Sequence, residues 1–197
     1  MLTDYRQKLG VGLALLFFSA AGAHGQGVTP VEVALGYSYV RTNAPPGGCG
    51  CFSMNGGSGG FAAHLGHGIS AVTDVGGYFQ NNVDSSGRSL RVETFLFGPR
   101  YSSSHWKRIT PFGQALFGGA LGSGTLYGPN ANTSASTSGF AMIAGGGLDF
   151  NVSSHFSVRL FQADYLMTRL PNSVNNNQNN IRITAGVVFH LGEPHTR

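Results

Sequence analysis

The chain has 197 residues, a formal net charge of +4 and only 10% charged residues, against about 25% in soluble domains. With 31 glycines and 41% hydrophobic residues, it is too polar for a helical membrane protein and too poor in charge for a disordered chain. Its basic residues are scattered and form no stripe with aromatic residues, so we expect no nucleic-acid partner. The composition fits a membrane β-barrel, whose strands are apolar on one face and small or polar on the other.

The first 25 residues predict a cleavable secretory signal peptide. Arg6 and Lys8 form its basic start, and residues 11–20 form an apolar run of typical length. Small residues allow cleavage after Ala23 or after Gly25. The run is shorter than the about 20 residues of a membrane-spanning helix, which favours cleavage over a retained anchor. The expected organisation is a signal peptide over 1–25, an outer-membrane β-barrel over 26–192 and a short tail over 193–197.

The segments that follow alternate with a period of two residues, which predicts β-strands. In the first of them, Leu35, Tyr37 and Tyr39 share one face, while Ala34 and Gly36 share the other. The last segment alternates in the same way. We expect eight strands, at residues 31–42, 58–69, 71–82, 89–102, 109–122, 138–152, 156–169 and 180–191.

Long polar connections alternate with short turns, of which the tightest is expected near Ile69–Ala71. This alternation predicts an all-β fold, an eight-stranded antiparallel up-and-down transmembrane barrel with long loops outside and short turns in the periplasm. A barrel of eight strands is filled by side chains and leaves no open pore. Aromatic residues near the strand ends, Tyr37 and Tyr39 among them, either form interfacial girdles or belong to the ordinary apolar wall.

Charged residues inside the expected strands are informative because an unpaired charge there is costly. Glu32 lies on the small-residue face of the first strand, and Arg182 lies on that face of the last, which adjoins the first if the barrel closes. Asp149 and Arg159 lie inward on neighbouring strands, and a β-bulge near Leu160–Phe161 would turn the rest of that strand's polar residues inward. The expected polar network of the lumen comprises Glu32, Arg100, Gln114, Asp149, Arg159, Gln162, Asp164 and Arg182. It is either a structural plug of ion pairs or a pathway for protons or solutes.

Other motifs give weak evidence of chemistry. Cys49 and Cys51 lie in the first long connection, and two thiolates supply only half of a tetrahedral zinc site, so their role stays open. His64 and His67 are three residues apart and point to opposite faces of a strand, so they cannot share a metal ion unless the strand bends. The glycine runs lack the context of a phosphate-binding loop, and no hydrolase or zinc-protease motif occurs. We expect no catalytic residue, cofactor or metal.

Several segments carry a resemblance to a known family. They are Phe-Gly-Pro-Arg at 97–100, Thr-Pro-Phe-Gly-Gln at 110–114, Gln-Ala-Asp-Tyr at 162–165 with Thr-Arg at 168–169, and the last strand with the Leu-Gly that ends it. With the leader and the eight strands, they resemble the small outer-membrane β-barrel superfamily of OmpA and OmpX type over nearly all of residues 28–192.

This resemblance implies a place in the bacterial outer membrane, contact with its lipid, and insertion by the barrel assembly machinery. Phe189 matches the aromatic residue of the C-terminal assembly signal. OmpA carries a peptidoglycan-binding domain after its barrel, whereas here only residues 193–197 follow, so no such anchor is expected.

The leading functional hypothesis is a non-enzymatic surface barrel with a polar, side-chain-filled lumen and loops in structural or contact roles. Its extracellular partner stays unknown. One alternative is a narrow conduit for small or hydrophobic solutes, which requires the polar network to open. Another is a lipid A-modifying enzyme, which needs a nucleophile near a histidine at the outer leaflet. The histidines at 64, 67, 105, 155 and 190 map to the barrel body or its periplasmic end, which argues against the enzyme.

Overall fold

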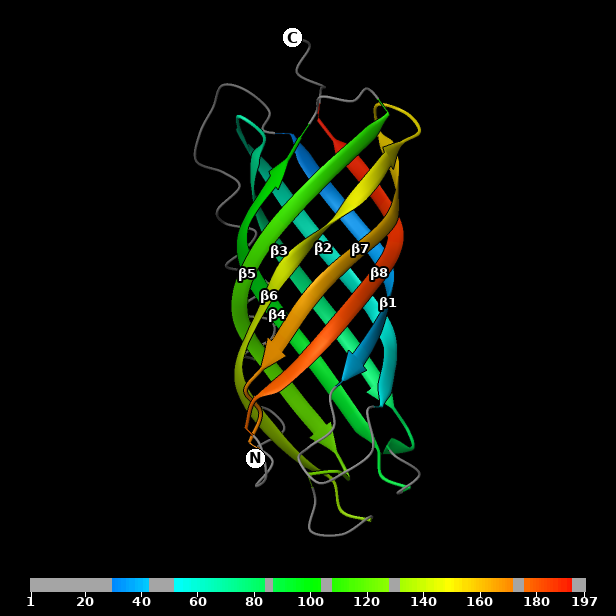
Figure 1. Cartoon of the computed structure of the whole chain (residues 1–197), viewed down its shortest axis with the longest axis vertical. Helices are drawn as coiled ribbons and strands as arrows, with labels where there is room; N and C mark the ends of the chain where they lie inside the picture. The colour runs from blue at the N-terminus through cyan, green and yellow to red at the C-terminus, as the bar shows by residue number, and fades with distance from the viewer. Residues whose placement is uncertain are drawn as a thin grey trace, which may run out of the picture.

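The computed structural model describes residues 30–42, 52–83, 87–103, 108–127, 132–171 and 176–192, which form a closed antiparallel barrel (Figure 1). The strands are β1 (Val31–Thr42), β2 (Ser53–Gly66), β3 (Ile69–Gln80), β4 (Leu90–Ser102), β5 (Ile109–Gly124), β6 (Ala135–Asn151), β7 (Phe156–Thr168) and β8 (Gln178–Leu191). Each strand pairs with the next along the chain, and β8 closes the sheet on β1. The predicted fold class is confirmed.

Some of the predicted features lie in parts of the chain that the structure does not describe. The signal peptide, the tail over 193–197, and Cys49 and Cys51 lie outside the described residues. Within the described part of the chain, no helix has the length and apolar character needed to cross a membrane.

The two ends of the barrel differ in their connections. At one end, called the turn end, the chain passes between β2 and β3, β4 and β5, and β6 and β7 in two to six residues. At the other, called the loop end, four connections take nine or ten residues each. The strands cross the molecule at a tilt between the turn end, uppermost in Figure 1, and the loop end. The alternation of short and long connections matches that of barrels whose long loops face the cell exterior.

The boundaries of β2 differ from the predicted ones. The turn after β2 lies at His67 and Gly68, not near Ile69–Ala71, and the strand begins at Ser53, not at residue 58. Gly66, His67 and Gly68 have φ of 114°, 54° and 79°. This left-handed backbone is open to glycine, and histidine is among the few other residues that adopt it. The sequence Gly-His-Gly therefore fixes the turn two residues earlier than the alternation of the flanking strands indicated.

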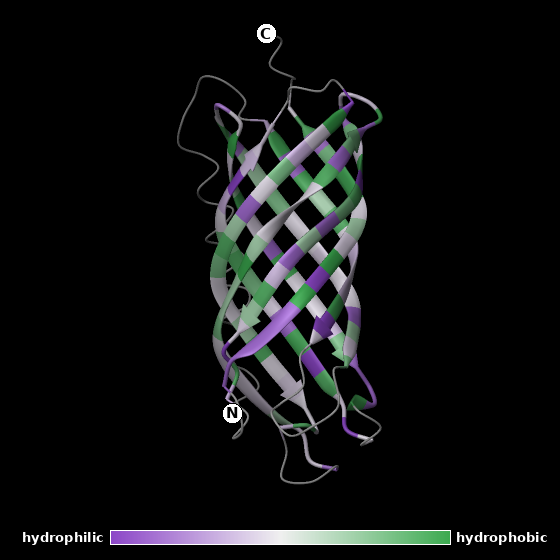
Figure 2. Ribbon diagram, viewed as in Figure 1, coloured by the Kyte–Doolittle hydropathy of each residue, from purple (hydrophilic) through white to green (hydrophobic). Residues whose placement is uncertain are grey.

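Burial alternates along the strands, as in β1, so successive side chains face the lumen and the outer surface in turn. Figure 2 shows hydrophobic and hydrophilic residues interspersed along the ribbons. Outward residues such as Leu35, Tyr37 and Phe97 are 55–60% exposed, whereas the inward Val40 and Ile143 are fully buried. A wall of exposed large apolar side chains is stable when lipid, not water, surrounds it. A closed barrel also pairs every strand edge, which the interior of a bilayer requires.

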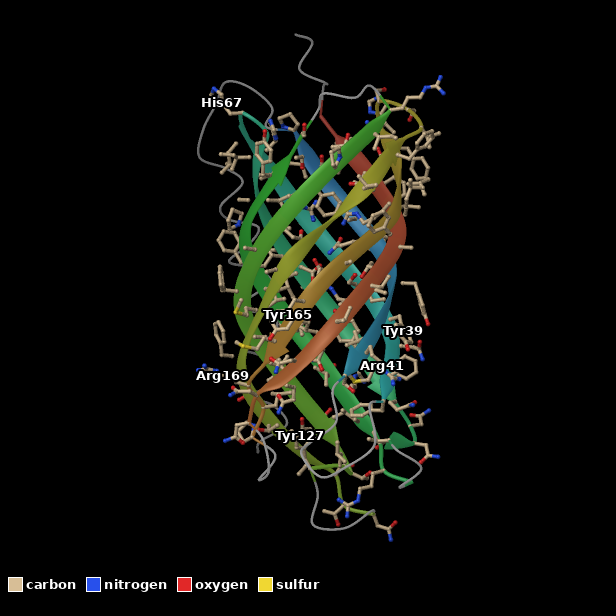
Figure 3. All side chains as sticks on the ribbon, viewed as in Figure 1. Tyr39, Arg41, His67, Tyr127, Tyr165 and Arg169 are labelled. Atoms are coloured by element: carbon tan, nitrogen blue, oxygen red, sulfur yellow. The ribbon has the colours of Figure 1, made fainter. Side chains whose placement is uncertain are left out.

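Three outward tyrosines mark one border of this apolar wall (Figure 3 labels Tyr39 and Tyr165). The hydroxyl of Tyr37 donates to Asn55, the hydroxyls of Tyr39 and Ser53 share a 2.6 Å hydrogen bond, and Tyr165 donates to Asn179. In each case the partner lies on the neighbouring strand, two residues nearer the loop end than the residue opposite the tyrosine. All three rings therefore lean toward the loop end, as interfacial tyrosines do when their hydroxyl groups lie on the water side of the interface.

Strand β7 contains the bulge predicted near Leu160–Phe161. Asp149 of β6 pairs with Arg159, and the preceding Leu148 pairs with Phe161, so Leu160 is the extra residue. Leu160 and Phe161 both face outward and are 51% and 46% exposed. The inserted residue shifts the alternation by one position, which turns Arg159 and Gln162 to the same side of the wall.

Candidate functional site

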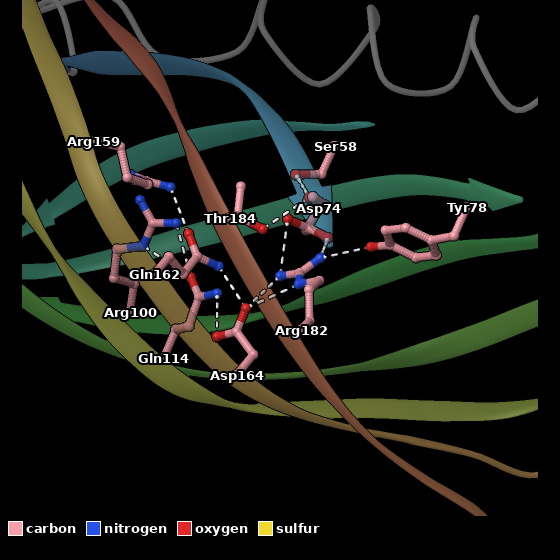
Figure 4. A network of polar contacts seen from close by, with 11 residues as sticks. Ser58, Asp74, Tyr78, Arg100, Gln114, Arg159, Gln162, Asp164, Arg182 and Thr184 are labelled. Carbon is pink, nitrogen blue, oxygen red and sulfur yellow. Dashed lines mark hydrogen bonds and ion pairs between the residues drawn. The ribbon is translucent and has the colours of Figure 1, made fainter. Parts of the chain in front are cut away.

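Arg182 is the centre of a buried polar network in the lumen (Figure 4). Its guanidinium lies between two carboxylates, with Nη1 2.7 Å from Asp74 Oδ1 and Nη2 2.7 Å from Asp164 Oδ2. Nη1 also donates to the hydroxyl of Tyr78 at 3.0 Å. Arg182 and Asp164 lie on the paired strands β8 and β7, whereas Asp74 lies on β3, so the interaction spans the lumen. The side chain of Arg182 is fully buried.

Asp164 also accepts hydrogen bonds from two glutamine side chains. Gln162 Nε2 donates to its Oδ2 at 2.7 Å, and Gln114 Nε2 approaches its Oδ1 at 3.4 Å. Gly145 on β6 lies opposite Asp164, and a Cβ at that position would lie 2.6 Å from Asp164 Oδ1 and 2.2 Å from the carbonyl oxygen of Ala163. The glycine therefore provides the space that the carboxylate occupies.

A second arginine continues the network toward the turn end. Arg159 binds Asp149 through two parallel hydrogen bonds, Nε to Oδ1 at 2.8 Å and Nη2 to Oδ2 at 2.9 Å. Its Nη1 donates to Gln162 Oε1 at 2.8 Å, which joins it to the Arg182 centre. The bulge makes this connection possible, since without it Arg159 and Gln162 would face opposite sides of the wall.

Arg100 completes the row of arginines. Its Nε and Nη2 donate to Gln114 Oε1 at 3.1 and 2.8 Å, and its Nη1 lies 3.8 Å from Glu32 Oε2. The guanidinium groups of Arg100 and Arg159 both lie over the ring of Phe112, with their Cζ atoms 4.6 and 4.5 Å from its centroid. The aromatic ring attracts both cations.

The turn end of the network is a chain of hydrogen bonds. Glu32 Oε1 lies 3.4 Å from His190 Nδ1, and His190 Nε2 lies 2.7 Å from Ser157 Oγ. Ser157 in turn donates to Asn151 Oδ1 at 2.8 Å. Because the serine proton is directed to Asn151 and the carboxylate only accepts, a doubly protonated imidazole satisfies both of its contacts.

The charges in the lumen nearly balance. Among the described residues, three arginines (Arg100, Arg159 and Arg182) face four carboxylates (Glu32, Asp74, Asp149 and Asp164). A protonated His190 brings the sum to zero. Each arginine donates several hydrogen bonds, so the network meets the condition under which buried charges are tolerated, namely that they are paired and hydrogen-bonded.

The lumen changes character toward the loop end. On β5, β6 and β7, the next inward residues after the network are Leu116, Ile143 and Leu166, which lie opposite one another on their paired strands and are at most 1% exposed. Val40 and Met54 pair in the same way on β1 and β2. We call the apolar side chains that fill this part of the lumen the apolar plug. It comprises Val40, Met54, Val83, Leu90, Val92, Leu116, Ile143, Leu166 and Leu170, with Phe52, Leu126 and Tyr127 packed against it.

Comparison with known proteins was informative only for structure. No protein-family model and no curated protein matches the chain. Ail, the attachment invasion locus protein of Yersinia pestis, matches with a TM-score of 0.57 at 14% identity, over 83% of this chain and 99% of that one. OprG from Pseudomonas aeruginosa matches with a TM-score of 0.56 at 9% identity, over 86% and 99%. Neisserial surface protein A matches with a TM-score of 0.54 at 15% identity, over 81% and 96%.

The chain has the fold of the eight-stranded outer-membrane β-barrels. The matched structures share its fold, and its exposed apolar wall and paired edges suit lipid. The exposed apolar wall is that of a barrel that spans a membrane, and in outer-membrane barrels the short turns face the periplasm and the long loops face the cell exterior.

The structure brings all eight expected lumen residues of this barrel into one network, but with different partners. Glu32 and Arg182 lie on the adjoining strands β1 and β8, yet Glu32 pairs in register with His190, eight residues away from Arg182. Glu32 contacts Arg100 and His190, while Arg182 contacts Asp74 and Asp164.

Sequence reasoning missed Asp74, Tyr78 and His190, which belong to the barrel's network. Asp74 is the only acidic residue of its strand, and alternation puts it on the face of Ser70 and Gly76. That parity was the available signal. His190 shares the inward parity of Arg182 on β8. The sequence pattern also did not predict the apolar plug, which fills much of the loop side of the lumen beside the buried Thr42, Thr168 and Asn180.

The remaining predicted features of the barrel lie apart from the network. Phe189 faces outward near the turn end, 41% exposed, with its ring centroid 5.5 Å from that of Phe156. His64 lies in β2, and its Nδ1 is 3.4 Å from Ser70 Oγ, whereas His67 lies in the turn. Among the described residues, no three histidine, cysteine, aspartate or glutamate side chains lie together as a metal site would require.

Proposed function

We propose that the protein is a non-enzymatic, non-conducting outer-membrane barrel whose role is structural and whose loop-end connections make contacts at the cell surface. The observation that carries this proposal is the position of Arg182, fully buried and held by carboxylates from β3 and β7. A solute moving along the lumen would have to break these ion pairs, and removing one partner of a buried pair costs about 3–5 kcal/mol.

The apolar plug supports the same proposal. Beyond Arg182, a polar solute would meet Leu116, Ile143 and Leu166, which line the lumen without a polar group on their side chains. A hydrophobic solute would face the opposite obstacle, since the turn-side half is charged. Each half of the lumen therefore excludes the class of solute that the other half would accept.

The hydrogen-bonded order of Ser157, His190 and Glu32 is that of a hydrolase triad, which makes the enzyme alternative specific enough to weigh. A nucleophilic serine must reach a substrate carbonyl and give its proton to the histidine. Ser157 is fully buried and its hydroxyl donates to Asn151. The arrangement therefore supports a structural chain of hydrogen bonds at the turn end, not a catalytic one.

Single-channel recording tests the proposal. The purified barrel, shown to be folded by its heat-dependent gel migration, is inserted into planar bilayers in 1 M KCl beside a general porin as the conducting control. We expect no conductance steps from the barrel. Regular steps from the folded wild-type protein would contradict the proposal and favour the conduit. Serine-directed fluorophosphonate labelling of Ser157, lost in Ser157→Ala, would favour the enzyme.

A further inference from the structure

Arg41 stands at the loop-end border of the lipid-facing wall. It follows Tyr39 on the outward face of β1 and is exposed. Its Nη1 donates to Ser53 Oγ at 3.0 Å, and the same hydroxyl bonds to Tyr39 at 2.6 Å. One hydrogen bond uses one of the five N–H donors of a guanidinium. The remaining N–H donors of Arg41 lie at the level of the interfacial tyrosines, which is the level of the lipid headgroups.

Among the described residues, β1 and the strands paired with it offer Arg41 no outward carboxylate. The sequence contains no aspartate or glutamate between Glu32 and Asp74, which covers β1, β2 and the connection between them. It contains none between Asp164 and Glu193 either, which covers the neighbouring β8. Glu32 and Asp74 themselves face the lumen, where they bind other partners.

A second arginine of the outer wall, three strands away, provides a contrast. Arg91 lies on the outer face of β4, also near the loop end, but its Nε lies 2.9 Å from Glu93 Oε1. Its side chain is 66% exposed and that of Glu93 36% exposed, so this arginine carries its own counter-charge at the surface. The two arginines have similar positions along the barrel axis and differ in local net charge.

From this difference we propose that Arg41, with Tyr39 and Ser53, forms a binding site for the phosphate headgroup of an outer-leaflet lipid. A guanidinium presents its donors in a planar fork that matches phosphate oxygens, and Ser53 and Tyr39 hold that fork at the headgroup level. The acyl chains of such a lipid would lie along the apolar wall beside Tyr37 and Ile183, which face outward on β1 and β8. Arg169, exposed after β7, lies at a similar height (Figure 3) and is the next arginine of the same kind.

Native mass spectrometry of the whole barrel in detergent micelles tests this site. The probes are dioleoyl phosphatidic acid and dioleoylglycerol, which share acyl chains and differ in the phosphate. We expect the wild-type barrel to retain phosphatidic acid in preference to dioleoylglycerol, and Arg41→Gln to weaken that retention about fivefold, the effect of one arginine near an anionic surface. Arg41→Lys should retain most of the binding.

Arg91→Gln is the matched control, because it removes an arginine that Glu93 already neutralises, and it should change retention less than twofold. Heat-dependent gel migration of every variant checks folding. Equal losses in Arg41→Gln and Arg91→Gln would overturn the site in favour of a general charge effect. Displacement of the lipid by millimolar inorganic phosphate would overturn the assignment to a lipid headgroup. This inference requires the barrel to lie in the membrane and does not depend on whether the lumen conducts.

Discussion

The two halves of the lumen are built from opposite materials on the same strands. Toward the turn end, three arginines and four carboxylates fill the interior, and toward the loop end it is filled by the apolar plug. The first half is held by directional ion pairs across the barrel, and the second is held by close packing. The comparison shows that the inward side chains of a narrow barrel must fill its lumen, and that either polar or apolar side chains can do so.

The largest expected effect comes from removing the central cation. Arg182→Met leaves Asp74 and Asp164 buried without their counter-charge, which we expect to lower the free energy of unfolding by about 3–5 kcal/mol. Urea unfolding in lipid vesicles, followed by gel migration without boiling, measures it. The triple variant Asp74→Asn, Asp164→Asn, Arg182→Met removes all three charges together and should recover much of the loss. A triple variant as unstable as the single one would show that packing, not charge, makes Arg182 important.

In the apolar plug, we expect that shortening a side chain leaves a cavity and so lowers the free energy of unfolding. Ile143 is fully buried among Leu116 and Leu166, so Ile143→Ala should cost about 2–5 kcal/mol in the same unfolding assay. The matched control is Ile183→Ala on the outer face of β8, where lipid can fill the space left by the side chain. Equal losses at the two positions would mean that the plug is not closely packed.

The smallest expected effect concerns Tyr127, which follows β5 and packs against the plug. Burial raises the pKa of the Tyr127 hydroxyl. A raised folded-state pKa contributes stability that is fully present below the unfolded value of about 10 and is lost as pH rises through the folded value. Unfolding of wild-type protein compared with Tyr127→Phe between pH 9 and 11 measures this. The difference should narrow as pH rises if Tyr127 is protonated in the folded state, and a pH-independent difference would contradict it.

Much of the fold and part of the site follow from the sequence. Period-two alternation assigned the inward faces of β1, β6 and β8, and the conflict in parity between Arg159 and Gln162 predicted the bulge near Leu160–Phe161. The partners of the charges were not predictable in this way. Arg182 reaches Asp74 on a strand that does not adjoin its own, and such a contact depends on the width and stagger of the closed barrel, which no local pattern encodes.

The apolar plug escaped prediction for a different reason. Val40, Leu116 and Ile143 are apolar residues within apolar segments, and alternation alone does not tell an apolar side chain in the lumen from one in lipid. The turn at His67 was predicted at the wrong position for a local reason. Its left-handed backbone interrupts the alternation that was used to define the ends of the strands.

Hydrogen exchange at the arginine Nε–H groups tests the sealed ionic lumen most directly. Each arginine Nε–H gives one ¹H–¹⁵N signal, and the variants Arg182→Met and Arg41→Gln assign the signals of Arg182 and Arg41. After transfer of the folded barrel in micelles to D2O, we expect the Arg182 signal to persist for hours, because its Nε–H is buried and bonded to Asp164, while the exposed Arg41 signal disappears at once. Loss of the Arg182 signal as fast as that of Arg41 would mean that water passes through the lumen, and would contradict the account of a closed barrel.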